Sequence, residues 1–302
     1  MVLAIVLLNW EQAYQALETI KRLSYWKRLN PLIIVVDNGS SDTYRSLLQN
    51  ASYGHHLILN SYNRGFAGGN NDGISLAITK GSSKILLLNI DADVTEECVV
   101  HLISCMEKKP ELGVIGPLLE VEGKIFAGGR DIGLYSDTQV IFNRNKQVSK
   151  ILPVDYVPGT VFLARTEVFK DTGLLAEDYF FSGEIADFCH KIKKGGYICA
   201  ICTKCTAIHK TEKSFLRKTL YPYYSLRNRF LYVQRNARYF SALLTGKWVI
   251  SGMVYSAFAY LRGDRPLSRS LRLAVKDGLT GRFGDQHQRF LAKICEDYSE
   301  MK

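Results

Sequence analysis

Two carboxylates follow an apolar run and are spaced so that both can reach one cation. Asp91 and Asp93 come directly after the segment Ile85-Leu86-Leu87-Leu88-Asn89. A hard cation such as Mg²⁺ takes one or two carboxylates together with phosphate oxygens and water, and it neutralises negative charge that grows on a departing diphosphate. The structural alternative is a turn in which Asp91 caps a helix that begins near Thr95. The spacing alone leaves both interpretations open.

Polar residues also follow two earlier apolar runs. Asn9 comes after Val2–Leu8, and the segment 37–42, Asp-Asn-Gly-Ser-Ser-Asp, comes after Leu32–Val36. A carboxylate at Asp37 can accept hydrogen bonds from a base N–H or a ribose hydroxyl, whereas Asp42 suits the N-cap of a following helix. We expect both roles, with Asp37 on a ligand and Asp42 on the cap.

The apolar runs predict the elements that position these side chains. Short runs rich in Val, Ile and Leu are typical of strands buried on both faces of a parallel sheet. Helix-length segments at 11–23, 43–49 and 69–80 separate them, and this alternation predicts an α/β sandwich. Parallel sheets bind ligands at the carboxyl ends of their strands, so Asn9, the 37–42 segment and the 89–93 segment should share one edge. Further strands are expected at 57–59, 114–119, 160–164 and 198–201, and further helices at 167–170, at 185–194 and from about 214 onward.

A glycine-rich segment opens the predicted helix at 69–80. It reads Asn63-Arg64-Gly65-Phe66-Ala67-Gly68-Gly69-Asn70-Asn71. Glycines at a helix N-terminus let the backbone approach a nucleotide or a phosphate. The segment matches neither the dinucleotide-binding fingerprint nor the P-loop, which argues against a dehydrogenase and a P-loop NTPase.

The net charge of +10 is confined to the C-terminal part. Residues 1–215 carry 23 Lys and Arg against 23 Asp and Glu, whereas residues 216–302 carry 16 against 6. Such a tail indicates an anionic partner, either membrane lipid or nucleic acid, and no groove-reading or RNA-stacking motif supports nucleic acid. The uncharged run Trp248–Leu261 is shorter than the ~20 residues that span a bilayer. It suits a helix in the membrane interface, with a buried C-terminal helix as the alternative.

Seven scattered cysteines predict a reducing compartment rather than a disulfide framework. Cys199, Cys202 and Cys205 have metal-ligand spacing, but a fourth ligand is missing, although His209 lies close. Residues 197–201 instead resemble a buried strand in which Cys acts as a small hydrophobe. We therefore expect no metal role for these thiols. The apolar N-terminus lacks a basic segment before it and predicts a first strand rather than a secretory signal.

In combination, these segments resemble the family 2 glycosyltransferases, which have the GT-A fold, and most closely the rhamnosyltransferase-like enzymes of bacterial polysaccharide assembly. The resemblance runs in order over about residues 3–230. The matching motifs are residues 35–42, 63–71 and 86–91, Pro158-Gly159-Thr160 with Arg165 and Phe169, Gly173 with 178–181, Gly183-Glu184 with Asp187, residues 195–197, His209, and Tyr223-Tyr224 with Arg227-Asn228.

This resemblance implies a GT-A type α/β/α sandwich with a mostly parallel sheet at 1–215 and a basic helical extension at 216–302. It implies an inverting enzyme that moves a sugar from a nucleotide-diphosphate donor, with Mg²⁺ or Mn²⁺, to a hydroxyl of a glycan or lipid-linked acceptor at the cytoplasmic face of the inner membrane. The implied metal ligands are Asp91, Asp93 and His209, and which of the two aspartates holds the ion stays open. The implied donor-binding residues are Asn9, Asp37, Asn38, Gly65, Asn70, Asp91, Gly159 and Arg227.

One motif departs from the family pattern. The family's late acidic motif runs Glu-Asp-x-Asp, and its first Asp is the expected base toward the acceptor hydroxyl; here the segment reads Glu184-Ile185-Ala186-Asp187. Isoleucine cannot take a proton, so Glu184 is favoured as the base, with Asp187 as the alternative. A nucleotide-sugar-binding protein without catalysis is a second hypothesis. A nucleotidyltransferase is a third, disfavoured because no Gly-rich basic motif follows the first apolar run.

Arginines of the C-terminal part are further candidates for the donor site. A guanidinium matches the geometry of phosphate oxygens, so Arg227 and Arg229 could bind the diphosphate. A solvated or lipid-facing basic helix is the alternative, and for Arg229 it is the favoured one.

Overall fold

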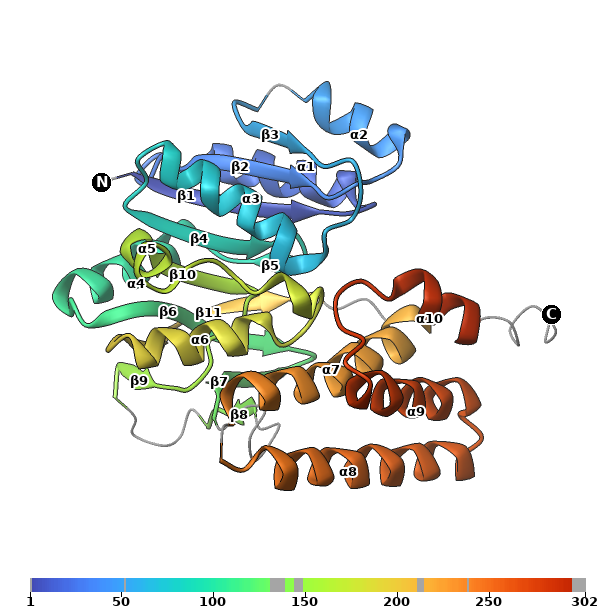
Figure 1. Ribbon diagram of the computed structural model, residues 1–302. Coiled ribbons are helices and arrows are strands. Elements are labelled where there is room, and N and C mark those ends of the chain that lie inside the picture. The colour runs from blue at the N-terminus through green and yellow to red at the C-terminus, as the bar shows by residue number, and fades with distance from the viewer. Residues whose placement is uncertain are drawn as a thin grey trace.

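An eleven-stranded sheet forms the centre of the α/β part of the chain (Figure 1). The computed structural model describes residues 2–51, 53–130, 139–143, 149–210, 215–237 and 239–294. The main strand order is β3-β2-β1-β4-β10-β6-β11-β5, with β7 and β8 joined to β6 and with β9 joined to β11. The strands are β1 (Leu3–Asn9), β2 (Leu32–Asp37), β3 (His56–Leu59), β4 (Lys84–Asn89), β5 (Ala92–Asp93), β6 (Leu112–Val121), β7 (Lys124–Gly129), β8 (Gln139–Ile141), β9 (Ile151–Pro153), β10 (Val161–Arg165) and β11 (Ile198–His209).

The first four strands run parallel, as the apolar runs predicted. Their register places the polar strand ends side by side, with Asn9 opposite Asp37 on β1 and β2, and Leu8 opposite Asn89 on β1 and β4. β10 is antiparallel to both β4 and β6, so the sheet is mixed beyond its parallel half. The edge that was expected to carry the polar residues is therefore present.

Helices cover both faces of this sheet. They are α1 (Ala13–Ser24), α2 (Asp42–Gln49), α3 (Gly65–Thr79), α4 (Glu96–Lys108), α5 (Thr166–Thr172) and α6 (Glu184–Lys194). Residues of α1, α2 and α4 belong to one buried cluster, and those of α3, α5 and α6 to the other. The result is the expected three-layer α/β/α sandwich.

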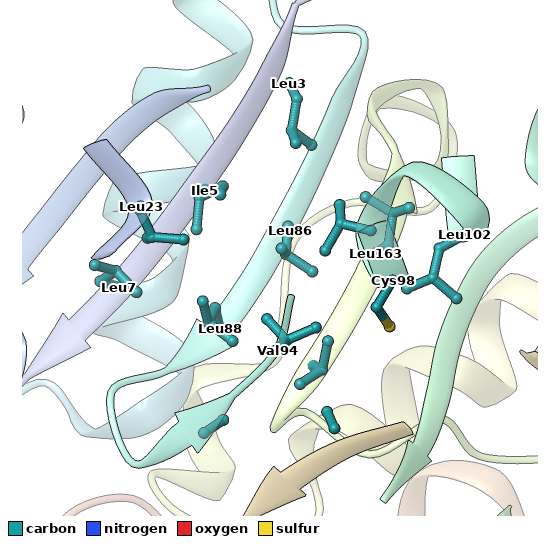
Figure 2. Packing of buried hydrophobic residues seen from close by; sticks show 14 of the residues in the cluster. Leu3, Ile5, Leu7, Leu23, Leu86, Leu88, Val94, Cys98, Leu102 and Leu163 are labelled. Carbon is teal, nitrogen blue, oxygen red and sulfur yellow. The ribbon is translucent and has the colours of Figure 1, made fainter. Parts of the chain in front are cut away.

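The sandwich is held by apolar side chains on both faces of the central strands. Alternate residues of β1 point to opposite sides, so that Ile5 and Leu7 join the α1 and α4 layer while Val6 joins the α3 layer. Figure 2 shows the first of these clusters, to which Leu86 of β4, Leu163 of β10 and Leu102 of α4 belong. Burial on both faces explains why these strands are apolar throughout.

The C-terminal part is a separate layer of helices beside the sandwich (Figure 1). It contains α7 (Phe215–Asn236), α8 (Ser241–Leu261), α9 (Arg265–Leu279) and α10 (His287–Ile294). These helices share a cluster that includes Trp248, Phe230 and Phe290, and Phe180 of the sandwich also belongs to it. Among the described residues, no helix combines the length and apolar character needed to cross a bilayer.

Several local expectations need correction. The glycine-rich segment is helical, because α3 begins at Gly65 rather than at Gly69. Asp42 is the first residue of α2, and the N-cap is Ser41, whose side chain makes no capping bond. Thr95, not Asp91, caps α4, and its hydroxyl accepts from Cys98 N at 3.2 Å. Asp91 is thereby left out of any helix cap.

Candidate active site

A cleft of about 580 Å³ opens at the carboxyl end of β4. Asn89 lines it from the end of β4 and Asp91 from the segment after that strand, and Gly159 and Thr160 line it from the segment before β10. The full lining also includes Trp10, Gln12, Phe66, Leu119, Val121, Phe126, Gln139, Tyr156, Pro158, Phe181, Ser182, Gly183, Glu184, Ile185, His209, Leu220, Tyr221 and His287. Of the predicted site residues, Asp91, Gly159, Glu184 and His209 lie in this cleft.

A strand pairing that the apolar runs of the sequence did not predict brings Asp91 and His209 together. The two-residue strand β5 pairs with the end of β11, so that His209 lies opposite Ala92. Lys210 N donates to Asp91 O at 2.9 Å and closes this pairing. His209 Nε2 then lies 3.2 Å from Asp91 Oδ2. Residues 118 positions apart are thus brought together as one N,O pair.

Asp93 has a different neighbour. Its carboxylate forms an ion pair with Arg22 of α1, and Arg22 also donates to the carbonyl of Ala92 at 2.9 Å. Asp93 does not line the cleft. Of the two aspartates that the sequence offered as metal ligands, Asp91 lines the cleft, whereas Asp93 ties β5 to α1.

Glu184 is the buried carboxylate of the cleft. It is the first residue of α6, follows Gly183 at the N-cap, and is only 5% exposed. Among the residues that the structure describes, none forms a hydrogen bond with its Oε2 atom, and burial raises the pKa of Glu184 to about 7. A carboxyl group with that pKa can exchange a proton near neutral pH, as a general base requires.

Asp187 points away from the cleft. It is 1% exposed and accepts from Asn236 Nδ2 at 2.8 Å and from Tyr179 Oη at 3.3 Å. Lys191 Nζ lies 3.4 Å from its carboxylate. Asp187 therefore joins α6 to α7, whereas Glu184 is the member of the pair that faces the cleft. Ile185, at the position where the family has an aspartate, is buried against Gly159.

The turn that precedes Glu184 has an unusual backbone. Phe180 and Ser182 adopt φ of 62° and 69°, in the left-handed region that non-glycine residues seldom occupy. Asn228 of α7 holds this turn, because its Nδ2 donates to the carbonyls of Tyr179 at 2.9 Å and Phe181 at 2.8 Å and to that of Ser182. Such a conformation costs on the order of 1–3 kcal/mol per residue, so these bonds stabilise the turn that carries Glu184.

Arg227 holds the same turn and does not reach the cleft. It is fully buried, and its guanidinium donates to Tyr179 O at 3.0 Å and to Gly284 O at 2.8 Å. The guanidinium also stacks on Tyr224, 4.6 Å from the ring centre, and burial lowers the pKa of Arg227. The expected contact of Arg227 with a diphosphate has no support in this geometry. Arg229 stacks on Trp248 at 4.1 Å, inside the helical layer.

The residues predicted to bind the nucleoside form a buried network at the ends of β1 and β2. Asn9 Nδ2 donates to Asp37 Oδ1 at 2.8 Å, and Arg45 Nε lies 3.4 Å from the same carboxylate. Asp37 is fully buried, and neither it nor Asn9 lines the cleft. Asn38 donates to Gly65 O at 3.0 Å and accepts from Arg64 N at 3.1 Å. In this structure these side chains support the loops behind Trp10 and Phe66, which do line the cleft.

The glycines have packing roles. Gly65 has φ of +71°, and a Cβ atom there would lie 2.3 Å from Phe180 O, while the neighbouring Phe66 N donates to that oxygen at 2.6 Å. Gly159 leaves room for Ile185, which would lie 3.0 Å from an added Cβ. Asn70 donates to Phe66 O at 2.9 Å. None of these contacts requires a phosphate, so the glycine-rich segment packs α3 closely against the sheet and the turn at Phe180.

Sequence reasoning missed part of the cleft wall. Trp10 and His287 lie edge to face, with ring centres 5.9 Å apart, and both line the cleft. Tyr221 of α7 lines it as well. Trp10 could have been found, because it follows the polar strand end at Asn9. His287 could not, since nothing in its sequence neighbourhood marks it and only the tertiary fold brings it to Trp10.

Comparison of the sequence with known proteins identifies the family of this chain. Residues 5–173 match the family described as glycosyl transferase family 2, so the chain belongs to this family of sugar-transferring enzymes. It is 26% identical over 246 residues to the low-salt glycan biosynthesis hexosyltransferase Agl10 of Haloferax volcanii, covering 76% of this chain and 74% of that protein. It is 23% identical over 275 residues to the dTDP-rhamnosyl transferase RfbF of Shigella flexneri, covering 84% and 88%. The chain is a glycosyltransferase of family 2, and it is similar in sequence to a hexosyltransferase and to a rhamnosyl transferase.

Solved structures show the same fold. The mannosyltransferase PcManGT from Pyrobaculum calidifontis, in complex with GDP-Man and Mn²⁺, matches with a TM-score of 0.59 at 12% identity, covering 92% of this chain and 86% of that one. GalNAc-T7 with UDP, GalNAc and Mn²⁺ matches with a TM-score of 0.60 at 14% identity, covering 99% and 57%. The predicted GT-A fold is confirmed.

Proposed function

We propose that this chain transfers a hexose or deoxyhexose from a nucleotide-diphosphate sugar to an acceptor hydroxyl with inversion at the anomeric carbon. The observation that carries the proposal is the meeting of Asp91, His209 and Glu184 in one cleft. Asp91 and His209 form an N,O pair suited to a cation, and Glu184 is a buried carboxyl group with a pKa of about 7. A site that holds both a diphosphate-binding cation and a base has what a direct displacement needs.

The pair at Asp91 and His209 fits a divalent ion. Two ligands at about 2.1 Å from an octahedral ion and at right angles to each other lie about 3.0 Å apart, and the two atoms here are 3.2 Å apart. Mg²⁺ or Mn²⁺ bound there would neutralise charge on the diphosphate of the donor. Mn²⁺ accompanies nucleotide or nucleotide sugar in both structural relatives.

In the proposed reaction Glu184 takes the proton of the acceptor hydroxyl. The oxygen then bonds to the anomeric carbon as the bond to the diphosphate breaks, and a single displacement inverts the configuration. Trp10, Tyr221 and Phe181 line the cleft with aromatic surface, on which sugar rings and bases commonly stack. Glu184 serves better than Asp187, whose carboxylate is engaged by Asn236 and Tyr179.

The metal assignment is tested with Asp91→Asn and the matched variant Asp93→Asn. Transfer and donor hydrolysis are measured over a panel of sugar nucleotides and over a Mn²⁺ titration. Asp91→Asn should raise the half-saturating Mn²⁺ concentration at least tenfold, while Asp93→Asn, which breaks only the pair with Arg22, should not. Equal metal dependence in both variants contradicts the assignment. A wild-type chain that binds sugar nucleotide but neither hydrolyses nor transfers it would support the non-catalytic alternative.

We further propose that the chain works against the anionic cytoplasmic surface of a membrane, where a lipid-linked acceptor would be reached. One side of α8 packs inward with Leu244, Trp248 and Ala259, while its other side exposes apolar side chains. The exposed apolar residues of α8 are Leu243, Ile250, Met253, Val254, Tyr255, Phe258, Tyr260 and Leu261. α8 lies at the edge of the molecule farthest from the sheet (Figure 1).

An exposed apolar surface of this extent marks an interaction site, and the charge excess of the C-terminal part selects an anionic surface as the partner. Each Lys or Arg near such a surface contributes roughly 1 kcal/mol. The test is sedimentation with vesicles of anionic or neutral lipid. Phe258→Asp should reduce binding, and Tyr25→Asp, at a residue of similar exposure on the sandwich (68% against 56% for Phe258), should not. Equal binding by both variants would refute the role of α8.

A further inference from the structure

A cluster of thiols and one imidazole lies between α4 and β11, outside the cleft. The ligand atoms of His101, Cys105 and Cys202 all lie within 4.8 Å of one another. Cys205 lies three residues after Cys202 in β11 and packs against the buried cluster that contains Cys202 and Cys98. None of these residues lines the cleft, so the cluster is not used by the proposed reaction.

The two elements are built so that these side chains meet. His101 and Cys105 are four residues apart on α4 and therefore share one helix face. Residues three apart in a regular strand point to opposite faces of the sheet, which would separate Cys202 from Cys205. A shift of register in β11 between Cys202 and Thr206 removes this separation, and both thiols pack on the α4 side of the sheet. Cys199 lies on the other side, against α6.

We propose that His101, Cys105, Cys202 and Cys205 form a tetrahedral site for a structural zinc ion. Zinc bound by thiolates and imidazole has Zn–S distances near 2.3 Å and Zn–N distances near 2.0 Å, so its ligand atoms lie about 3.3–3.8 Å apart. The ligand atoms of His101, Cys105 and Cys202 already lie within 4.8 Å of one another and reach that spacing by small side-chain adjustments. Cys205, three residues after Cys202 on the same side of the sheet, would turn in as the fourth ligand. Four N and S ligands make a closed site, which is the form of structural rather than catalytic zinc.

The surroundings suit an ion that enters from solvent. His101 is exposed and Cys105 is half-buried, while Cys202 is buried, so the site is open on the imidazole side only. Cys98 points into the hydrophobic core instead (Figure 2) and is 5% exposed.

A zinc ion at this position would stabilise the elements next to the candidate active site. α4 begins three residues after Asp93, and β11 ends at His209. An ion that joins α4 to β11 would therefore fix the helix that follows Asp91 in the chain to the strand that ends with His209. The expected ligand at the thiol site is Zn²⁺, whereas the N,O pair at Asp91 and His209 suits a harder cation.

The test is the metal content of the full chain purified under reducing conditions with zinc in the growth medium. One equivalent of zinc per chain is expected, and replacement by Co²⁺ should give the intense charge-transfer absorption of thiolate–cobalt bonds. Cys105→Ser and Cys202→Ser should each lower zinc retention after dialysis at least tenfold. Cys199→Ser is the matched control, because Cys199 is a buried thiol of the same strand on the opposite face, and it should retain the ion, as should Asp91→Asn.

The wild-type stoichiometry and cobalt spectrum need no variant, so the proposal stays testable if a serine variant does not fold. A zinc chelator should lower the thermal midpoint of the wild-type chain and of Cys199→Ser by several degrees. A wild-type chain that holds no zinc and gives no thiolate–cobalt absorption overturns the proposal. So does zinc retained equally by Cys105→Ser and Cys202→Ser, or a disulfide between Cys202 and Cys205 in the chain as purified.

Discussion

Glu184→Gln should lower the transfer activity of the chain and, relative to wild type, raise its stability as the pH increases. Glu184 is buried and its pKa is raised from the ordinary 4.5 to about 7, and each pKa unit corresponds to 1.36 kcal/mol. Between these two pH values the folded chain keeps a proton that the unfolded chain has released. Stability therefore falls as the pH rises from 4.5 to 7 and stays constant above, with a total loss of about 3 kcal/mol. Glutamine has no proton to lose and escapes this effect.

The assay compares unfolding by urea for the wild-type chain and Glu184→Gln at pH 5 and at pH 8. The variant should gain stability relative to wild type as the pH rises, by about 2–3 kcal/mol between the two conditions. Transfer by the same variant should fall by a factor on the order of 10²–10⁴, which is the usual contribution of a general base. Asp187→Asn is the control, because Asp187 holds Asn236 and its loss should destabilise the chain. A stability difference that is the same at both pH values would refute the raised pKa of Glu184.

Three further predictions follow from the same site. Log kcat/KM of the wild-type chain should decline on the acid side of about pH 7, where Glu184 takes up a proton, and a pH–rate profile that stays flat from pH 5 to 8 contradicts its role as base. Arg227→Lys should lower the free energy of unfolding by about 2–4 kcal/mol, because the carbonyl of Gly284 loses its guanidinium donor and that of Tyr179 keeps only Asn228; a higher KM for the donor sugar nucleotide at unchanged stability would instead restore the diphosphate role. Gly65→Ala should destabilise the chain more than Gly81→Ala in thermal unfolding, since both glycines have positive φ but only Gly65 meets a neighbour, Phe180 O; equal effects would show that close packing at Gly65 contributes nothing.

The parallel strands and the layers could be predicted because they rest on local patterns. β1, β2 and β4 are runs of Val, Ile and Leu that each end in a polar residue, and burial on both faces selects such runs. The helices between them follow from their length and spacing. The glycine-rich segment was harder, because glycine favours turns and the tertiary contacts of Gly65 with Phe180 decide that α3 starts there.

Local patterns alone could predict a candidate-site residue only where it follows a strand, as Asp91 does. Gly159, Glu184 and His209 were predicted from the resemblance to the family. The pairing of β5 with β11 that brings Asp91 to His209 involves only two residues of β5, too few to leave a periodic signal. The same limit applies to the thiol cluster. Cys202 and Cys205 lacked a fourth ligand in their own segment, and the partners His101 and Cys105 come from a helix about 100 positions earlier.

The contacts of α7 indicate that the C-terminal helices also support the turn that carries the proposed base. A tail that only bound lipid would need no contact with the base, yet Asn228 and Arg227 hold the carbonyls of the turn that precedes Glu184. Tyr221 of the same helix lines the cleft, and α7 packs against α9, which in turn packs against α8. Removal of residues 216–302 should therefore abolish transfer to soluble acceptors as well as binding to vesicles. A truncated chain that still transfers sugar in solution would show that the turn at Phe180 and Ser182 keeps its conformation without Asn228.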